Sequence, residues 1–95
     1  MDKLQLGQIV RSTAGRDKNQ FYVIVDYIQE DSDWYFLADG DIRKISKPKK
    51  KNIKHIAKTN MIDTILSEKL NSNVKIQDSE LRMVLDRYNY DYESN

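Results

Sequence analysis

Eight lysine and arginine residues lie between Ile42 and Asn60, a stretch that contains no aspartate or glutamate. Lysine ammonium groups on flexible stems suit phosphate oxygens, and each phosphate that they neutralise releases condensed counterions. The other eight basic residues share the chain with all 15 acids, so the net charge of +1 conceals a cationic segment on a nearly neutral body. This segment favours contact with a polyanion over the alternative, a solvated basic loop. Its cations are Arg43, Lys44, Lys47, Lys49, Lys50, Lys51, Lys54 and Lys58.

Four further residues could contact phosphate. Three of them precede the basic run, and His55 lies within it. Arg16 and Lys18 stand in a polar loop, which Gly15 allows to turn because glycine tolerates positive φ. Arg11 alternates with a valine in a short strand, so we expect it to point outward. His55 has no carboxylate near it in sequence that would orient it as a base, so we interpret it as an ordinary member of the basic segment.

Residues 7 to about 58 carry strand patterns. We expect strands at 8–11, 20–28, 34–38, 42–45 and 53–57, although the spacing of the last fits a bulge or a 3₁₀ turn better than a regular strand. The strand at 20–28 is apolar on both faces and must be covered on both sides. One predicted face holds Phe21, Val23, Val25 and Tyr27, and the other holds Tyr22, Ile24 and Ile28.

Turn signals separate these strands. Residues 31–33 read as a polar turn, and Asp39-Gly40 is a two-residue hairpin signal that predicts a type I′ turn. Pro48 lacks an N–H for a central ladder, so 46–52 should be an exposed loop or an edge. Of the aromatic residues, Tyr22 and Tyr35 should be core. Trp34 is the one we expect to be partly exposed, and it could stack on bases.

Helical patterns follow from about residue 60. Asn60 could cap a first helix, with Asp63 in the capping-box position, and Asp78 could cap a second helix and pair with Arg82. Residues 61–95 hold seven acids and four bases, a net charge of −3. We expect the two helices to cover the outer face of the strand at 20–28. The predicted apolar stripes are Ile62, Ile65, Leu66 and Leu70, then Leu81, Val84, Leu85 and Tyr88.

The segment Ala-Gly-Arg-Asp-Lys at 14–18, set between an alternating strand and a long apolar strand, resembles the KOW motif. The likeness is to KOW-type large-subunit ribosomal proteins of archaea and eukaryotes and to their small bacterial relatives. It covers about residues 5–58. Where relatives often carry glycine after the lysine, this chain has Asn19, which tolerates positive φ better than most residues. The residues expected to have a structural role, rather than to contact RNA, are Gly7, Gly15, Asn19 and Gly40.

This resemblance implies a small SH3-like barrel of about five strands. With the helical patterns that follow, we expect a mainly β fold with C-terminal α structure, in which a two-helix extension packs on the barrel. We expect a barrel over 1–58, a helical hairpin of the same domain over 59–90 and a flexible tail over 91–95. The implied function is non-enzymatic RNA binding, associated with the ribosome or rRNA. The RNA-binding residues would be Arg11, Arg16, Lys18, Arg43, Lys44, Lys47, Lys49, Lys50, Lys51, Lys54, His55 and Lys58.

The alternative is a protein-interaction module of the SH3 or Tudor type, whose acidic, tyrosine-rich helical end would be the partner-binding surface. The absence of cysteine excludes disulfides and thiolate metal sites. Asp31/Asp33 and Asp39/Asp41 could bind Mg²⁺, but we interpret them as turn residues. We find no nucleophile elbow or phosphate-binding loop, and expect no cofactor, metal or small-molecule substrate. No apolar run approaches the roughly 20 residues of a membrane span, so we expect a cytoplasmic protein, monomeric when free.

Overall fold

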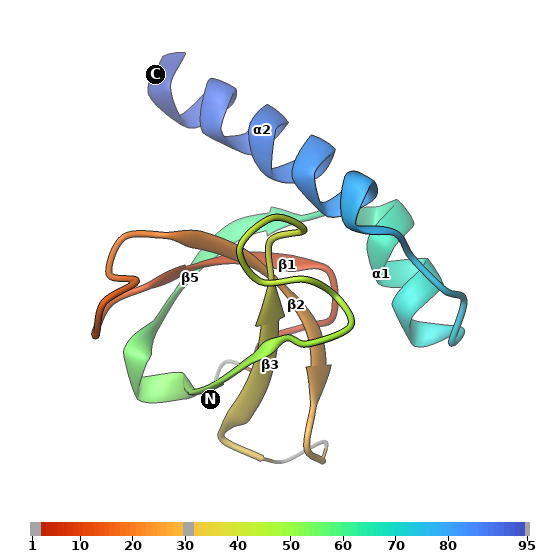
Figure 1. The fold of residues 1–95 in the computed structure, drawn as a ribbon, viewed down its shortest axis with the longest axis horizontal. Coiled ribbons are helices and arrows are strands. Elements are labelled where there is room, and N and C mark those ends of the chain that lie inside the picture. Colours follow the sequence, from red (N-terminus) through yellow and green to blue (C-terminus); the bar gives the residue numbers. More distant parts are fainter. Residues whose placement is uncertain (1–2, 30–31, 95) are drawn as a thin grey trace.

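The computed structural model describes residues 3–29 and 32–94, with side chains up to Tyr88. Over these residues the chain is mainly β, with two helices at the C-terminal end (Figure 1). This confirms the predicted fold class. The elements are β1 (Gln8–Ser12), β2 (Phe21–Tyr27), β3 (Trp34–Ala38), β4 (Lys49–Asn52), the 3₁₀ turn η1 (Ile53–His55), β5 (Ile56–Ile62), α1 (Thr64–Asn71) and α2 (Asp78–Ser94).

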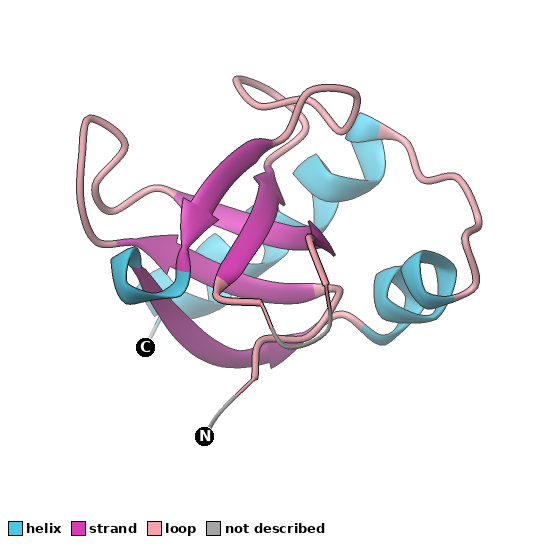
Figure 2. Cartoon of the chain, turned by 90° about the horizontal axis from the view of Figure 1, so that it is seen from below, coloured by secondary structure: helices cyan, strands magenta, loops and turns pink. Residues whose placement is uncertain are grey.

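The described strands form one antiparallel sheet in the order β4-β3-β2-β1-β5. β4 and β5 are therefore at opposite edges of the sheet, although only the three residues of η1 separate them in the chain. So short a link forces the sheet to curl until the end of β4 comes near the start of β5 (Figure 2). The result is a barrel-like sheet whose two edge strands are not paired with each other along the described ladder.

Two apolar cores lie on the two faces of this curled sheet, and β2 contributes to both, as its sequence predicted. The helices cover the outer face, so the predicted helical cover is confirmed. The inner core consists of Leu4, Val10, Tyr22, Ile24, Tyr35 and Leu37. The outer core, between sheet and helices, consists of Ile9, Val23, Val25, Ala38, Leu66, Ile76, Leu81, Leu85 and Tyr88.

A β-bulge in β2 changes the face of its last residues. The register with β3 shifts between Ile24 and Asp26, so that Tyr27 pairs with Tyr35 and packs against the inner core. The prediction that Tyr27 shares a face with Val23 is therefore wrong, because the extra residue reverses the alternation of side chains beyond it. Ile28, predicted to share a covered face with Tyr22 and Ile24, is half exposed. Asp31 of the predicted 31–33 turn lies outside the described residues.

The strand predicted over 42–45 is absent from the described structure, in which residues 39–48 form a loop and the strand begins only at Lys49. The prediction of an edge strand near Pro48 is confirmed by β4. The prediction of a type I′ turn at Asp39-Gly40 is wrong. Such a turn needs positive φ at both central positions, and of these two residues only Gly40 has it, at 79°.

Asp39 organises this loop through its own side chain. Its Oδ1 accepts the backbone N–H of Asp41 at 2.9 Å and that of Arg43 at 2.8 Å. Such local bonds compete with a strand ladder, which explains why the apolar pattern of 42–45 does not form a strand. Ile42 is 78% exposed as a result. The interpretation of Asp39 and Asp41 as turn residues fits these bonds.

The first helix begins later than predicted. β5 continues to Ile62, and Asp63 rather than Asn60 is the N-cap of α1, with Oδ1 accepting the N–H of Leu66 at 2.9 Å. Ile62 therefore belongs to a strand, and Ile65 is 63% exposed instead of contributing to the buried stripe. The 3₁₀ turn considered for 53–57 is confirmed as η1.

The second helix carries the predicted stripe: Leu81, Leu85 and Tyr88 are buried, and Val84 packs beside them. Arg82 donates to the carbonyl of Gly40 at 2.6 Å, which ties α2 to the 39–48 loop. α2 extends to Ser94, whereas the sequence predicted an irregular tail over 91–95; Asn95 and the side chains beyond Tyr88 lie outside the described part. Among the described residues, no helix has the length and apolar character needed to cross a membrane.

Candidate nucleic-acid interface

The loop at 13–19 joins β1 to β2 and turns tightly at two positions. Gly15 has φ 87° and Asn19 has φ 75°, as expected for an asparagine in the place of glycine. The N–H of Asn19 donates to the carbonyl of Ser12 at 2.8 Å, and the Arg11 guanidinium donates to Asn19 Oδ1 at 2.8 Å. Arg11 therefore braces the loop from the strand, which explains its half-buried side chain.

Asp17, inside this loop, is the centre of a polar network that reaches the edge strand. Its Oδ1 lies 2.8 Å from Lys51 Nζ, and its Oδ2 lies 3.1 Å from Lys49 Nζ. The hydroxyl groups of Ser12 and Tyr22 each donate to the same carboxylate at 2.9 Å. Because Lys49 and Lys51 lie on β4, their bonds to Asp17 hold the 13–19 loop against this strand.

The network determines the protonation state of Asp17. Burial by itself would raise the pKa of this carboxyl, but the hydrogen bonds from Lys51, Lys49, Ser12 and Tyr22 outweigh burial and hold the pKa well below its ordinary value. Burial and the hydrogen bond to Asp17 raise the pKa of Tyr22 above its ordinary value. Asp17 is thus an anion and Tyr22 a neutral donor at every pH near neutrality.

The consecutive lysines of β4 point to different faces, because successive side chains of a strand alternate. Lys49 and Lys51 pair with Leu37 and Tyr35 of β3 and point inward to Asp17. Lys50 points outward, with Nζ 5.1 Å from the centroid of the Trp34 ring.

The three consecutive lysines therefore do not form one exposed tract, as the sequence interpretation assumed. Lys51 is buried and also donates to Ser12 Oγ at 2.6 Å and to the Ala14 carbonyl at 2.9 Å. Its ammonium group has three acceptors within the protein, so we correct its assignment as an RNA contact. Lys49 is half-buried on the same carboxylate and retains only part of its surface.

Exposed cations are carried by the clamped loop and by two segments that adjoin it. The N–H of Thr13 donates to the carbonyl of His55 at 3.0 Å, so the loop lies beside η1 as well as beside β4 (Figure 1). We define the cationic surface as the exposed side chains carried by these three neighbouring segments. Its members are Arg16, Lys18, Lys50, Lys54 and His55.

The remaining predicted contacts lie further along the chain. Lys58 is exposed on β5, opposite Val10 in the register, and Lys47 is exposed just before Pro48. Lys44 is exposed next to Ile45, whose N–H donates to Asp78 Oδ1 at 2.8 Å, so this part of the 39–48 loop is drawn toward α2. Arg43 is half-buried, and its carbonyl accepts the N–H groups of Asp39 and Gly40.

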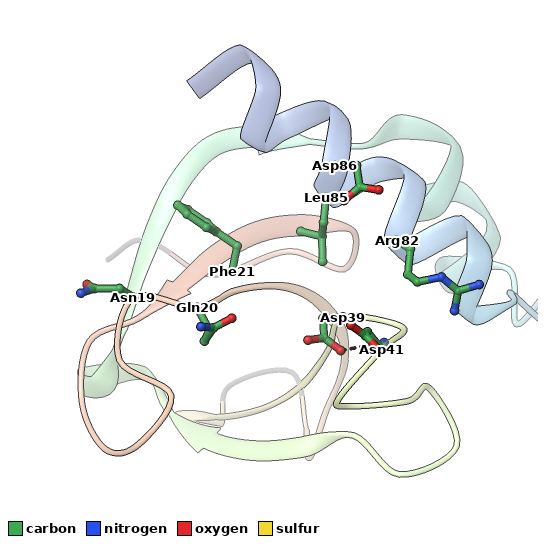
Figure 3. Close-up of a pocket in the computed structure, with 8 residues that line it drawn as sticks. All are labelled: Asn19, Gln20, Phe21, Asp39, Asp41, Arg82, Leu85 and Asp86. Carbon is green, nitrogen blue, oxygen red and sulfur yellow. Dashed lines mark hydrogen bonds between the residues drawn. The ribbon is translucent and has the colours of Figure 1, made fainter. Parts of the chain in front are cut away.

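A cleft of about 520 Å³ lies between the start of β2, the 39–48 loop and α2 (Figure 3). Phe21 and Leu85 supply its apolar part, and the carboxylates of Asp39, Asp41 and Asp86 line it with the single cation Arg82. Its charge balance is unfavourable for phosphate, and this acidic cleft adjoins the end of the 13–19 loop, whose Asn19 lines it. Among residues 3–29 and 32–94 we find no group of three or more histidine or carboxylate side chains that could hold a metal ion.

Sequence reasoning missed Asp17, which the structure shows to be the residue that assembles the surface. A signal was present, since Asp17 lies within the Ala-Gly-Arg-Asp-Lys segment that carries the family resemblance. Its lysine partners follow 32 and 34 residues later, beyond the reach of local patterns. Comparison of the sequence with protein-family models finds none that matches, and no curated protein matches the chain either.

Proposed function

We propose that this protein binds RNA through the cationic surface and has no catalytic role. The observation that carries the proposal is the clamp of Asp17 on Lys49 and Lys51, which holds the 13–19 loop against β4. Because the loop is fixed, Arg16 and Lys18 are presented with little conformational entropy left to lose on binding, and the segments that adjoin the loop carry the exposed Lys50 and Lys54. The Gly-Arg-Asp-Lys likeness to KOW-type ribosomal proteins gives independent support for rRNA or the ribosome in the cytoplasm as the partner.

Binding would be dominated by the phosphate backbone. Lysine contacts to phosphate position a protein on its nucleic acid but do not distinguish bases. Arg16 differs from them, because a guanidinium can form two parallel hydrogen bonds to one phosphate. If about four phosphates are neutralised, the logarithm of the binding constant should fall with the logarithm of salt concentration at a slope of roughly −3 to −4.

The test compares two double variants that each remove two positive charges. Arg16→Gln with Lys18→Gln changes the cationic surface, and Lys75→Gln with Arg87→Gln changes exposed positions at the helical end. Binding to rRNA fragments is measured by fluorescence anisotropy at several salt concentrations. We expect the first pair to make the salt slope shallower by about two and the second pair to leave it nearly unchanged. Equal losses in both pairs would contradict a localised interface.

The acidic cleft favours one second candidate, a module that binds a basic protein segment. Asp39, Asp41 and Asp86 could pair with lysine or arginine of a partner, while Phe21 and Leu85 contact its aliphatic parts. Pull-down from a lysate before and after RNase treatment separates the two functions. Partners lost after RNase support RNA binding, and partners retained support the protein-interaction module.

A further inference from the structure

Trp34 is an exposed aromatic residue at the edge of the cationic surface. It is the one tryptophan of the chain and is 42% exposed, whereas Tyr22 and Tyr35 are buried in the inner core. It opens β3 on the face shared with Phe36 and Ala38, which are covered by the helical layer further along the strand. The indole thus lies at the uncovered end of this face.

One cation contacts this indole, and a second is carried by a segment that adjoins the start of β3. Lys50 Nζ lies 5.1 Å from the ring centroid, and the residue opposite Trp34 in the register is Asn52. Asn52 Oδ1 accepts the N–H of Lys54 at 3.1 Å, and Ile53 donates to the carbonyl of Asp33 at 2.7 Å. These bonds fix η1, which carries the exposed Lys54, next to the start of β3.

We propose that Trp34 stacks on an unpaired RNA base and that Lys50 and Lys54 contact the phosphates on either side of that nucleotide. The inference rests on the proposed RNA binding and adds a preference for single-stranded or bulged RNA over a continuous duplex. A paired base is already stacked on its neighbours and offers no free face, whereas an unpaired base can stack on an aromatic side chain. Nothing in this contact distinguishes one base from another, because every base has a π-face.

The present contact between Lys50 and the ring is compatible with this role. An exposed cation–π pair is weak, and a lysine stem rotates freely about several bonds. When a base takes the ring face, the ammonium group can turn to the adjacent phosphate without movement of the backbone. The strand itself is held by the β3–β4 ladder from Trp34–Asn52 to Leu37–Lys49.

The first experiment uses Trp34 as its own reporter, since the fluorescence of the chain's one tryptophan comes from this site. The wild-type protein is titrated with an unstructured oligouridine, with an oligoadenosine and with a blunt RNA duplex, all with the same number of phosphates. We expect both single strands to quench the emission and to bind more tightly than the duplex. Equal affinity for all three, with unchanged emission on saturation, would overturn the inference.

The second experiment replaces the ring and measures affinity with labelled RNA by anisotropy. Trp34→Leu should lower the affinity for single-stranded RNA roughly tenfold with an unchanged salt slope, and Trp34→Phe should recover most of it. Met83→Ala, at an exposed apolar residue of α2, is the matched control and should have no effect. Circular dichroism and thermal unfolding establish that each variant is folded.

The two proposals fail in different ways. If Trp34→Leu binds like the wild type while Arg16→Gln with Lys18→Gln loses affinity, the stacking role is wrong and RNA binding stands. If neither variant changes the affinity of the protein for any RNA, the cationic surface is not an RNA interface and both proposals fall.

Discussion

Lys51 and Asp17 meet at the inner side of the curled sheet, with Nζ 2.8 Å from Oδ1, although 34 residues separate them in the chain. The side chains are 9% and 12% exposed, and a buried charge is tolerated only when it is paired and hydrogen-bonded. Ser12 and Ala14 accept the other Lys51 protons, so the ammonium group is fully satisfied. The pair thus determines both the position of the loop and which lysines remain available to a ligand.

Asp17→Asn should destabilise the protein by about 3 kcal/mol, because it keeps the shape of the side chain but leaves Lys51 buried without its counter-ion. The measurement is the free energy of unfolding in urea at pH 7. Asp86→Asn, at an exposed residue of α2, is the control and should change this free energy by less than about 0.5 kcal/mol. Similar values for the two variants would show that the network adds nothing to stability.

The stabilisation from Asp17 should be lost in acid. Its pKa is ordinarily 3.8 and is lower in the folded protein, because hydrogen bonds from both lysines outweigh the opposite effect of burial. The unfolded chain therefore takes up the proton first as the pH falls. The contribution is complete above about pH 5 and declines as the pH falls through 3.8 toward the folded-state pKa. The difference between the unfolding free energies of the wild type and Asp17→Asn should thus become smaller as the pH falls from 5 to 3; a constant difference would contradict this account.

Gly40→Ala should detach the 39–48 loop from α2. A Cβ at this position would lie 2.2 Å from the carbonyl oxygen of Asp78, and φ is 79°. The overlap is with helix backbone, which does not move aside, so we expect a loss of about 3 kcal/mol or more. Gly15→Ala is the control. Its φ of 87° is as unfavourable, but the nearest atom to the added Cβ is 3.6 Å away, so it should lose only about 1–2 kcal/mol. Thermal unfolding distinguishes the two, and equal losses would exclude the steric explanation.

Local sequence patterns predicted the elements in which the periodicity of apolar residues matches the face that is buried. The alternation in 21–25 and the stripe of Leu81, Leu85 and Tyr88 place both cores correctly, since burial follows directly from a period of two or 3.6 residues. The strand predicted at 42–45 failed because Asp39 binds the neighbouring N–H groups. The helix start at Asn60 failed because β1 pairs with β5 as far as Ile62, a long-range contact that outweighs a capping signal.

The candidate site was predictable in composition and not in geometry. The distribution of charge along the sequence identified the basic segment and the 13–19 loop, which lie side by side in the structure. It did not show that lysines 49–51 point to different faces of a strand. Their separation depends on β4 being a strand, and on the meeting of Lys51 with an acid 34 residues earlier. A tertiary ion pair of this kind has no local period, so only the folded chain reveals it.

The last prediction concerns the alternation of the lysines on β4. Lys50→Gln should make the salt slope of RNA binding shallower by about one, because one phosphate contact is lost. It should lower the free energy of unfolding by less than about 1 kcal/mol, because only an exposed cation–π contact is lost in the folded protein. Lys51→Met should lower stability by about 2–3 kcal/mol, since Asp17 loses its closest cation but keeps Lys49. Its salt slope should stay unchanged, because its charge is already neutralised inside the protein. Urea unfolding and anisotropy titrations on both variants give the four values. Equal changes of slope would mean that the tract acts as a diffuse charge and that the inward orientation of Lys51 does not matter for binding.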